Sequence, residues 1–192
     1  MIDAAARAAS DLDELGVAAA LVGGLAVGAR AEPRFTRDVD IVVAVEDDEQ
    51  AERLVHALSG RGYSIDTVIE QAKTGRLATA RLRHRSSPQV FVDLLFASSG
   101  IEREIVMLAQ PVRYRKGTTL RAAITGHLIA LKVLSESEHR LQDRIDLRAL
   151  AEVATYEDWA VAREAVRLIR KRGFHRGRAL SRRLRRWSRS RT

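Results

Sequence analysis

The chain has 192 residues, of which 46% are apolar and 30% are charged, as in a typical soluble globular protein. It contains no cysteine, so disulfides, thiolate metal ligands and cysteine nucleophiles are excluded. The most apolar stretch, residues 17–27, is too short and too interrupted by glycine to cross a bilayer. The amphipathic, partly acidic start lacks the pattern of a secretory signal. We therefore expect a cytoplasmic protein that does not bind membranes.

The formal net charge of +8 is concentrated at the C-terminal end. Residues 165–192 contain 12 basic residues and no acidic one, which leaves 21 basic against 25 acidic residues in the rest. A localised positive field favours a polyanionic partner. A solvated, arginine-rich helix face would produce the same pattern, and composition does not separate the two interpretations.

The first 120 residues alternate between helical and extended patterns, which predicts an α/β sheet. Gly16 ends the first helix, and Pro33 stops a short helical stretch because the residue before proline disfavours helix. Helices are expected over 2–15, 25–31 and 47–62, strands over 17–22, 38–45, 63–70, 77–85 and 89–97, a turn at 73–75, and an edge hairpin over 111–120.

After residue 120 the pattern becomes helical, with helices expected over 122–137, 140–154 and 156–173 and a last basic helix beyond them. Thr155 and Asp158 match a capping box. Leu180, Leu184 and Trp187 share one helical stripe, so we expect the basic tail to pack against the protein. The predicted division is an α/β domain over 1–120 and a C-terminal helical region over 121–192.

Two carboxylates stand at the start of the strand over 38–45. Asp38 and Asp40 are two residues apart, so their side chains leave the same face, while Val39, Ile41 and Val43 point into the core. Mg²⁺ and similar hard cations bind such oxygens and keep other positions for substrate phosphates. The pair therefore predicts a divalent metal site suited to phosphoryl transfer.

A third carboxylate, Asp93, lies in the middle of an apolar strand. A buried carboxylate is costly unless it is paired or bound to metal. We interpret Asp93 as the third metal ligand; the alternative is an ion pair with Arg81 or Arg83 on an adjacent strand.

Gly23 and Gly24 precede the helical stretch over 25–31. Glycine amides at a helix N-terminus bind phosphate well, because the donors and the helix dipole both point at the anion. The alternative is an ordinary tight turn. Neither a Walker A loop nor a dinucleotide-binding fingerprint is present, because their lysine and glycine spacings are missing.

These pieces together resemble the DNA polymerase beta-type nucleotidyltransferase superfamily. The shared features are a glycine pair, a short helix, an R-x-T-x-D-V-D motif and a single aspartate on a later strand. The second half resembles AbiEii-type and MenT-like nucleotidyltransferase toxins. The matching positions in this sequence are Gly23, Gly24, Arg34, Thr36, Asp38, Asp40 and Asp93, followed by His127, Lys132, Arg140, Asp143 and Asp146.

The resemblance implies a nucleotidyltransferase-type mixed β-sheet flanked by helices, in which residues 1–120 form the catalytic domain. It also implies transfer of a nucleoside monophosphate from an NTP, with Mg²⁺ or Mn²⁺ as cofactor. Asp38, Asp40 and Asp93 would hold the metal, and Lys132 and Asp143 would complete the catalytic set. Gly23, Gly24, Arg34, Thr36, Lys132 and Arg140 would bind the nucleotide. Many superfamily members have Gly-Ser where this chain has Gly23-Gly24, so a hydroxyl contact to phosphate is lost.

Several of these residues have simpler explanations. Lys132 could extend its stem to the surface, Arg140, Asp143 and Asp146 could form ion pairs within one helix, and His127 could simply pack.

The acceptor expected from the resemblance is RNA, most plausibly the 3′ end of tRNA, with the protein acting as the toxin of a toxin–antitoxin pair and binding a cognate antitoxin. The basic tail suits a phosphate backbone. Its candidate RNA-binding residues are Arg178, Arg182, Arg183, Arg185 and Arg186. Two alternatives stay open: transfer to a small molecule such as an aminoglycoside or to a protein hydroxyl, and a non-catalytic module that binds RNA or a partner.

Overall fold

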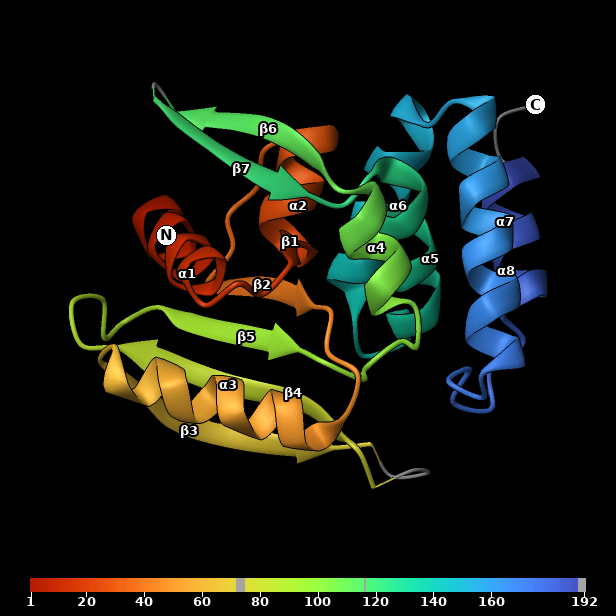
Figure 1. Cartoon of the computed structure of the whole chain (residues 1–192). Coiled ribbons are helices and arrows are strands. Elements are labelled where there is room, and N and C mark those ends of the chain that lie inside the picture. Colours follow the sequence, from red (N-terminus) through yellow and green to blue (C-terminus); the bar gives the residue numbers. More distant parts are fainter. Residues whose placement is uncertain (72–74, 116, 190–192) are drawn as a thin grey trace.

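A seven-stranded mixed sheet organises the computed structural model, which describes residues 1–71, 75–115 and 117–189 (Figure 1). Its strands follow the order β3-β4-β5-β2-β1-β7-β6. The predicted α/β class is confirmed, while the turn expected at 73–75 falls mostly outside the described residues. The strands are β1 (Ala19–Leu21), β2 (Asp38–Val43), β3 (Tyr63–Glu70), β4 (Leu77–His84), β5 (Phe91–Leu95), β6 (Gln110–Arg115) and β7 (Thr118–Ala122).

The register of three central strands places polar residues side by side. β2 pairs in parallel with β5, so that Asp40 lies opposite Asp93. β5 in turn pairs antiparallel with β4, and Asp93 lies opposite Arg81. Directly paired residues share one face of a sheet. The side chains of Asp40, Asp93 and Arg81 therefore form one row across the strands.

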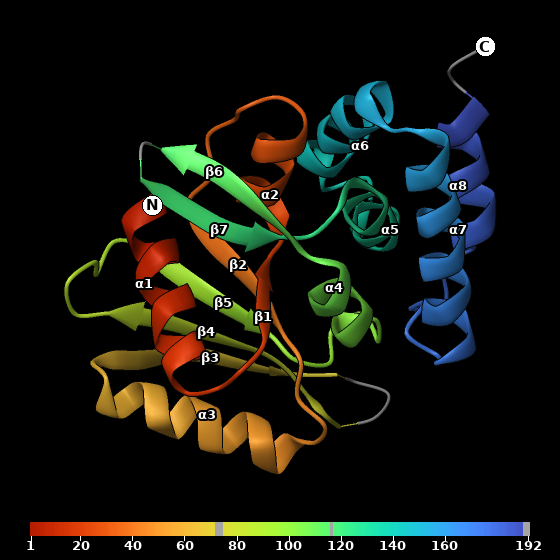
Figure 2. The ribbon, with the colours of Figure 1, turned by 45° about the horizontal axis from the view of Figure 1, so that its top comes forward.

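Eight helices are present in the described part of the chain, and they fall into two groups. The first group contacts the sheet: α1 (Ile2–Glu14), α2 (Gly23–Arg30), α3 (Asp48–Gly60) and α4 (Glu102–Leu108). The second group is α5 (Thr125–Ser135), α6 (Leu141–Val153), α7 (Tyr156–Lys171) and α8 (Leu180–Arg189). Figures 1 and 2 show α5 and α6 between the sheet side of the molecule and the outer pair α7 and α8. α2 packs on both β2 and α6, and so joins the two groups.

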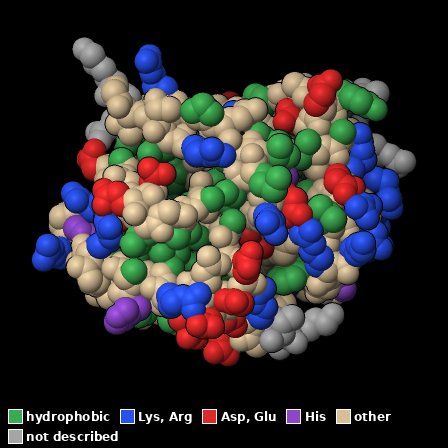
Figure 3. Space-filling model, viewed as in Figure 1, with side chains coloured by type: hydrophobic (Ala, Val, Ile, Leu, Met, Phe, Trp, Pro, Cys, Tyr) green, Lys and Arg blue, Asp and Glu red, His purple; other side chains and the backbone are tan. Residues whose placement is uncertain are grey.

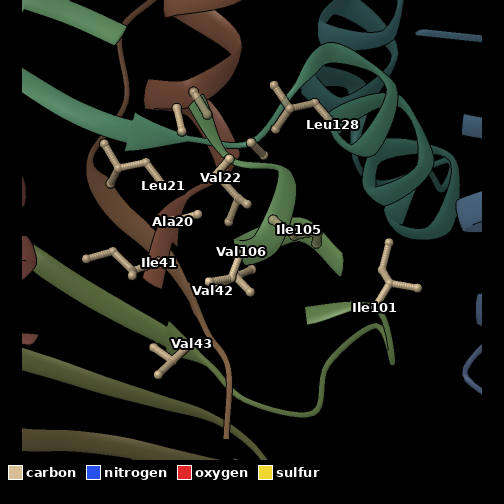
Figure 4. Packing of buried hydrophobic residues seen from close by; sticks show 14 of the residues in the cluster. Ala20, Leu21, Val22, Ile41, Val42, Val43, Ile101, Ile105, Val106 and Leu128 are labelled. Atoms are coloured by element: carbon tan, nitrogen blue, oxygen red, sulfur yellow. The ribbon is translucent and has the colours of Figure 1, made fainter. Parts of the chain in front are cut away.

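One hydrophobic core runs through both predicted parts of the chain, from Ala4 in α1 to Leu184 in α8. Figure 4 shows Val42 of β2 beside Val106 of α4, with Leu128 of α5 on the helical side of the same cluster. The sequence pattern gave no expectation for α4, a helix of 7 residues. The boundary at residue 120 stays a prediction.

The basic tail packs against the protein, as its apolar stripe predicts. Leu180 and Leu184 are buried, and Trp187 packs against the core. The capping box of Thr155 and Asp158 at the start of α7 is confirmed. Within the described residues, no helix is long and apolar enough to span a membrane.

Candidate active site

Asp38 and Asp40 open into a cleft of about 1030 Å³ between the sheet and the helical group. Asp93, Lys132 and Asp143 also line this cleft, together with other residues that the sequence motif predicts: Gly23, Gly24, Arg34, Thr36 and Arg140. A pocket of this size that gathers several charged groups is where a ligand site is expected. The structure thus brings all the predicted catalytic and nucleotide-binding residues to one cavity.

The first residue of α2 fits tightly against Asp40. Gly23 has a φ of +58°, a conformation that favours glycine. A Cβ atom at this position would lie 1.8 Å from Oδ2 of Asp40, far closer than van der Waals contact allows. Only a residue without a side chain therefore lets the N-terminus of α2 approach the carboxylate this closely.

The second glycine of the pair faces two other residues of the motif. A Cβ at Gly24 would lie 2.8 Å from both Oγ1 of Thr36 and Nη2 of Arg34. These two side chains therefore occupy the space beside the first turn of α2. The hydroxyl of Thr36 also donates to the backbone oxygen of Asp38 at 3.3 Å, which ties the loop to the start of β2.

The charge on Asp40 is poorly compensated. Burial, and to a lesser extent the neighbouring Asp93 and Asp38, raise the pKa of Asp40 to about 6 against the opposing fields of Lys132 and Arg34. A cation bound beside Asp40 would stabilise its charged form. The position therefore suits a divalent ion at neutral pH.

Asp93 is held by Arg81 from the neighbouring strand. Nε of Arg81 donates to Oδ1 of Asp93 at 2.8 Å, and Nη2 donates to Oδ2 at 2.7 Å. Nη2 also lies 3.5 Å from Oδ2 of Asp38. The ion pair that the sequence offered as an alternative for Asp93 is therefore present, with Arg81 and not Arg83, which pairs with Asp66. The metal-binding role of Asp93 stays a prediction.

Lys132 ends in a buried network of charges. Its Nζ lies 2.8 Å from Oδ1 of Asp143 and 2.7 Å from Oδ2 of Asp146, and these two carboxylates are 3% and 1% exposed. Arg34 reaches Asp146 at 2.7 Å, and Gln142 donates to it at 3.0 Å. Burial would raise the pKa of Asp146, but the hydrogen bonds from Lys132, Gln142 and Arg34 outweigh burial and lower it. The alternative in which Lys132 merely extends to the surface does not fit a side chain that is 12% exposed.

The sequence prediction placed Asp143 with Lys132 in the catalytic set and left Asp146 out of it. Both aspartates contact the amino group of Lys132, and Asp146 also binds Arg34 of the R-x-T-x-D-V-D motif. Arg140 bonds Asp143 at 3.1 Å within the same helical segment, so the intrahelical pair expected as an alternative is also present. His127 is buried against the helical core, and burial lowers its pKa to about 4, so it packs as a neutral ring.

A divalent metal fits part of this site. Within the described ranges, no three carboxylate or imidazole groups come together as a ready metal site. Asp38 and Asp40 nonetheless offer oxygen ligands on one face of β2, and Mg²⁺ or Mn²⁺ commonly binds one or two carboxylates together with substrate phosphates. Asp93 fits less well, because Arg81 already occupies both of its oxygens.

The C-terminal arginines lie in two different settings. Arg178, Arg182 and Arg185 line a groove of about 730 Å³ between α7 and α8. Arg178 also donates to the backbone oxygen of Leu134, and Arg183 donates at 2.6 Å to that of Glu136, so these two help to fix the tail. Arg186 is exposed on α8. Figure 3 shows Lys and Arg side chains gathered along the edge of the molecule where Figure 1 places α7 and α8.

The fold is that of nucleotidyltransferase-like proteins. The chain superposes on the crystal structure of an antigenic nucleotidyltransferase-like protein from Paracoccidioides brasiliensis with a TM-score of 0.55 and 18% identity, covering 96% of this chain and 91% of that one. It is also similar to the lincomycin-bound lincosamide antibiotic adenylyltransferase LnuA, with a TM-score of 0.45 and 15% identity over 74% of this chain and 91% of that one. A third similar structure is ANT(2")-Ia in complex with adenylyl-2"-tobramycin, with a TM-score of 0.47 and 13% identity over 85% of this chain and 92% of that one.

A scan against protein-family models finds no match, and neither does a search of curated proteins. At identities this low, the structural likeness shows the fold.

The close approach of Gly23 to Asp40 gives a direct prediction. Gly23→Ala should lower the free energy of unfolding by at least about 2 kcal/mol, because the methyl group collides with the carboxylate and the backbone φ is unfavourable for alanine. Chemical denaturation measures the change. Gly60→Ala is the matched control, since nothing lies within 4 Å of its added Cβ, and it should leave stability unchanged or raise it by up to about 1 kcal/mol. Equal effects of the two substitutions would contradict the packing described for Gly23.

The pKa of Asp40 predicts a pH-dependent stability. Because the pKa is about 6 in the fold against 3.8 for the free side chain, Asp40 supports folding below about pH 4 and opposes it as the pH rises through about 6. Without divalent cations, Asp40→Asn should therefore be more stable than the wild type at pH 7, by on the order of 2 kcal/mol, and equally stable below pH 4. Denaturation curves from pH 3.5 to 8 measure this difference. Asp13→Asn, at an exposed position on α1, is the control; a stability gain for Asp40→Asn that does not change with pH would refute the assignment.

Proposed function

We propose that the protein is a metal-dependent nucleotidyltransferase that transfers a nucleoside monophosphate from an NTP to an RNA acceptor, namely the 3′ end of tRNA. The observation that carries the proposal is the facing arrangement of Asp38 and Asp40 on β2 and the glycine turn of α2, with Lys132 lining the same cleft. The nucleotidyltransferase-like fold supports it.

Each group in the cleft has a defined task in this proposal. Asp38 and Asp40 would hold a divalent cation, which neutralises phosphate charge and polarises the reacting phosphorus when bound. The N-terminus of α2 presents backbone donors and a positive dipole end for phosphate oxygens. Thr36 adds a hydroxyl beside that turn. Asp93 stays the predicted third carboxylate of the metal site, and Arg81 compensates its negative charge.

Lys132 suits the triphosphate for a simple reason of donor number. An ammonium group has three N–H donors. Asp143 and Asp146 account for two of them, which leaves one for a phosphate oxygen in the cleft. Arg34 and Arg140, which also line the cleft, add positive charge near the same place. The two aspartates thus hold the three basic side chains in place without cancelling all of their positive charge.

An RNA acceptor is supported by the groove between α7 and α8. Its lining contains seven basic or imidazole side chains and no carboxylate: Arg167, Arg170, Lys171, His175, Arg178, Arg182 and Arg185. His175 and Gly177 line both this groove and the cleft that holds Asp40. A strand whose phosphates follow the groove therefore reaches the cleft with its end. Phosphate contacts of this kind position nucleic acid without reading its sequence.

The toxin role, and with it a cognate antitoxin that binds the protein, rests on the resemblance of the motif around Lys132, Arg140 and Asp143 to AbiEii-type and MenT-like toxins. The toxin role predicts an effect beyond the enzymatic activity: a toxin that modifies RNA stops the growth of the cell that expresses it. The two claims can be tested with one set of variants.

Purified protein incubated with Mg²⁺, each labelled NTP in turn and total tRNA should transfer label to tRNA. Asp40→Asn should lower the rate at least about 100-fold, because a metal ligand is lost. Arg83→Gln, on the same sheet but outside the charged row of Asp40, Asp93 and Arg81, should keep most of the activity. Absence of transfer with all four NTPs and tRNA sinks the proposal; transfer to a protein or an aminoglycoside instead moves it to those acceptors.

Growth of cells that express the wild type should stop on induction, and cells that express Asp40→Asn should grow normally. Label transfer without growth arrest would keep the enzymatic proposal and reject the toxin role.

The basic groove makes a prediction about binding. The double variant Arg182→Glu/Arg185→Glu should weaken tRNA binding at least about tenfold and flatten its dependence on salt, because each lost phosphate contact reduces the slope of log K against log salt by about 0.7–0.9. Filter binding at several salt concentrations measures both. Arg53→Glu, exposed on α3, is the matched charge reversal outside the groove. If it weakens binding as much as the double variant, the groove is not the RNA-binding surface.

A further inference from the structure

Arg81 stands at the end of the row that Asp40 and Asp93 form across β2 and β5. It is the direct antiparallel partner of Asp93, and Asp93 is the direct parallel partner of Asp40. Its guanidinium grips Asp93 side-on through two hydrogen bonds of 2.8 and 2.7 Å, and the same Nη2 lies 3.5 Å from Asp38. One guanidinium thus contacts two of the three carboxylates of the predicted metal site.

The position of Arg81 is fixed from two sides. Its guanidinium carbon lies 4.8 Å from the centre of the Phe91 ring, which presents its face from β5. The two parallel hydrogen bonds to Asp93 supply the other constraint, and a bidentate arginine–carboxylate pair of this kind is among the stronger side-chain interactions. Arginine also keeps its charge at all accessible pH values. The site therefore carries a permanent positive charge whose geometry the sheet has already set.

A second divalent cation at Asp93 would meet two obstacles. Both oxygens of Asp93 already accept hydrogen bonds from Arg81. Any cation on these oxygens would also lie beside a guanidinium of the same sign, at a carboxylate that is only 11% exposed. Asp38 and Asp40 keep the geometry to bind one cation together with a triphosphate.

We propose that Arg81 takes the place of the second divalent ion at Asp93, so that the chain binds one divalent cation per nucleotide. Arg81 is a positioning residue in this proposal: it supplies the charge that holds Asp93 in place. The proposal rests on the proposed function, since it concerns the metal count of the same nucleotide site.

The test counts bound metal and does not depend on activity. Equilibrium dialysis with radioactive Mn²⁺ and each of the four α,β-methylene NTPs in turn gives the ratio of bound Mn²⁺ to bound nucleotide. The wild type should give one. Arg81→Gln, which removes the charge and the bidentate pair, should open Asp93 and give two. Arg81→Lys keeps a charge near Asp93 and should stay at one.

Arg83→Gln is the matched control. Arg83 lies on the same strand and stacks on the same ring, at 4.6 Å from the Phe91 centre, but it pairs with Asp66 outside the site. Its ratio should stay at one.

The wild-type ratio can overturn the proposal even if Arg81→Gln fails to fold. A ratio of two in the wild type overturns the proposal, because the second metal ion would then displace Arg81 from Asp93. A ratio of one in folded Arg81→Gln also overturns it, because Arg81 would then have no influence on the count. A wild type that binds none of the four nucleotides rejects the proposed function, and the Arg81 proposal falls with it.

Discussion

The structure depends on the repulsion among three carboxylates placed on neighbouring strands. The register of β2, β5 and β4 forces Asp40, Asp93 and Arg81 into one row, and Asp38 lies one strand period away. Such a concentration of negative charge at the edge of a core is unfavourable unless cations compensate it. Arg81 compensates Asp93, whereas Asp40 keeps a raised pKa. The site therefore has an uneven charge distribution, with the uncompensated charge beside the glycine turn.

A second set of charges joins the helical group to the sheet. Arg34 comes from the loop before β2, Lys132 from α5 and Asp146 from α6, and the two cations meet at a carboxylate that is only 1% exposed. Breaking a buried pair on one side leaves an unpaired charge, so the network opposes any large separation of the two groups. The cleft that holds Asp40 lies between these groups. The charged residues that line the cleft therefore also help to fix its width.

The sequence predicted most of the elements, and it named candidate residues that the structure brings to one cleft, because many of these features depend on local patterns. The two-residue spacing of Asp38 and Asp40 sets their common face, and the glycine pair predicts the turn that meets them. Helix α4 escaped prediction because only 7 residues form it and its burial depends on β1 and β2.

The partner of Asp93 depended on register, which local patterns do not give. Arg81 and Arg83 both alternate toward the same face of β4, and only the pairing of β4 with β5 puts Arg81 opposite Asp93. The role of Asp146 has a similar origin, because its contact with Arg34 joins residues 112 positions apart. A signal for Arg81 does exist in the sequence: a basic residue that points to the same face as a buried acidic strand position.

The glycine pair also explains how this chain differs from the Gly-Ser form of the superfamily that it resembles. A serine at position 24 would place its Cβ 2.8 Å from both Thr36 and Arg34, so the space for that side chain is already filled. The hydroxyl of Thr36 and the guanidinium of Arg34 stand where a serine would lie; the hydroxyl already donates to the backbone oxygen of Asp38, whereas the guanidinium has N–H donors to spare for an anion at the start of α2. The R-x-T part of the motif and the second glycine are therefore one structural unit. The missing side chain at Gly24 makes room for Arg34, which in turn reaches Asp146 and connects the start of α2 to the network around Lys132.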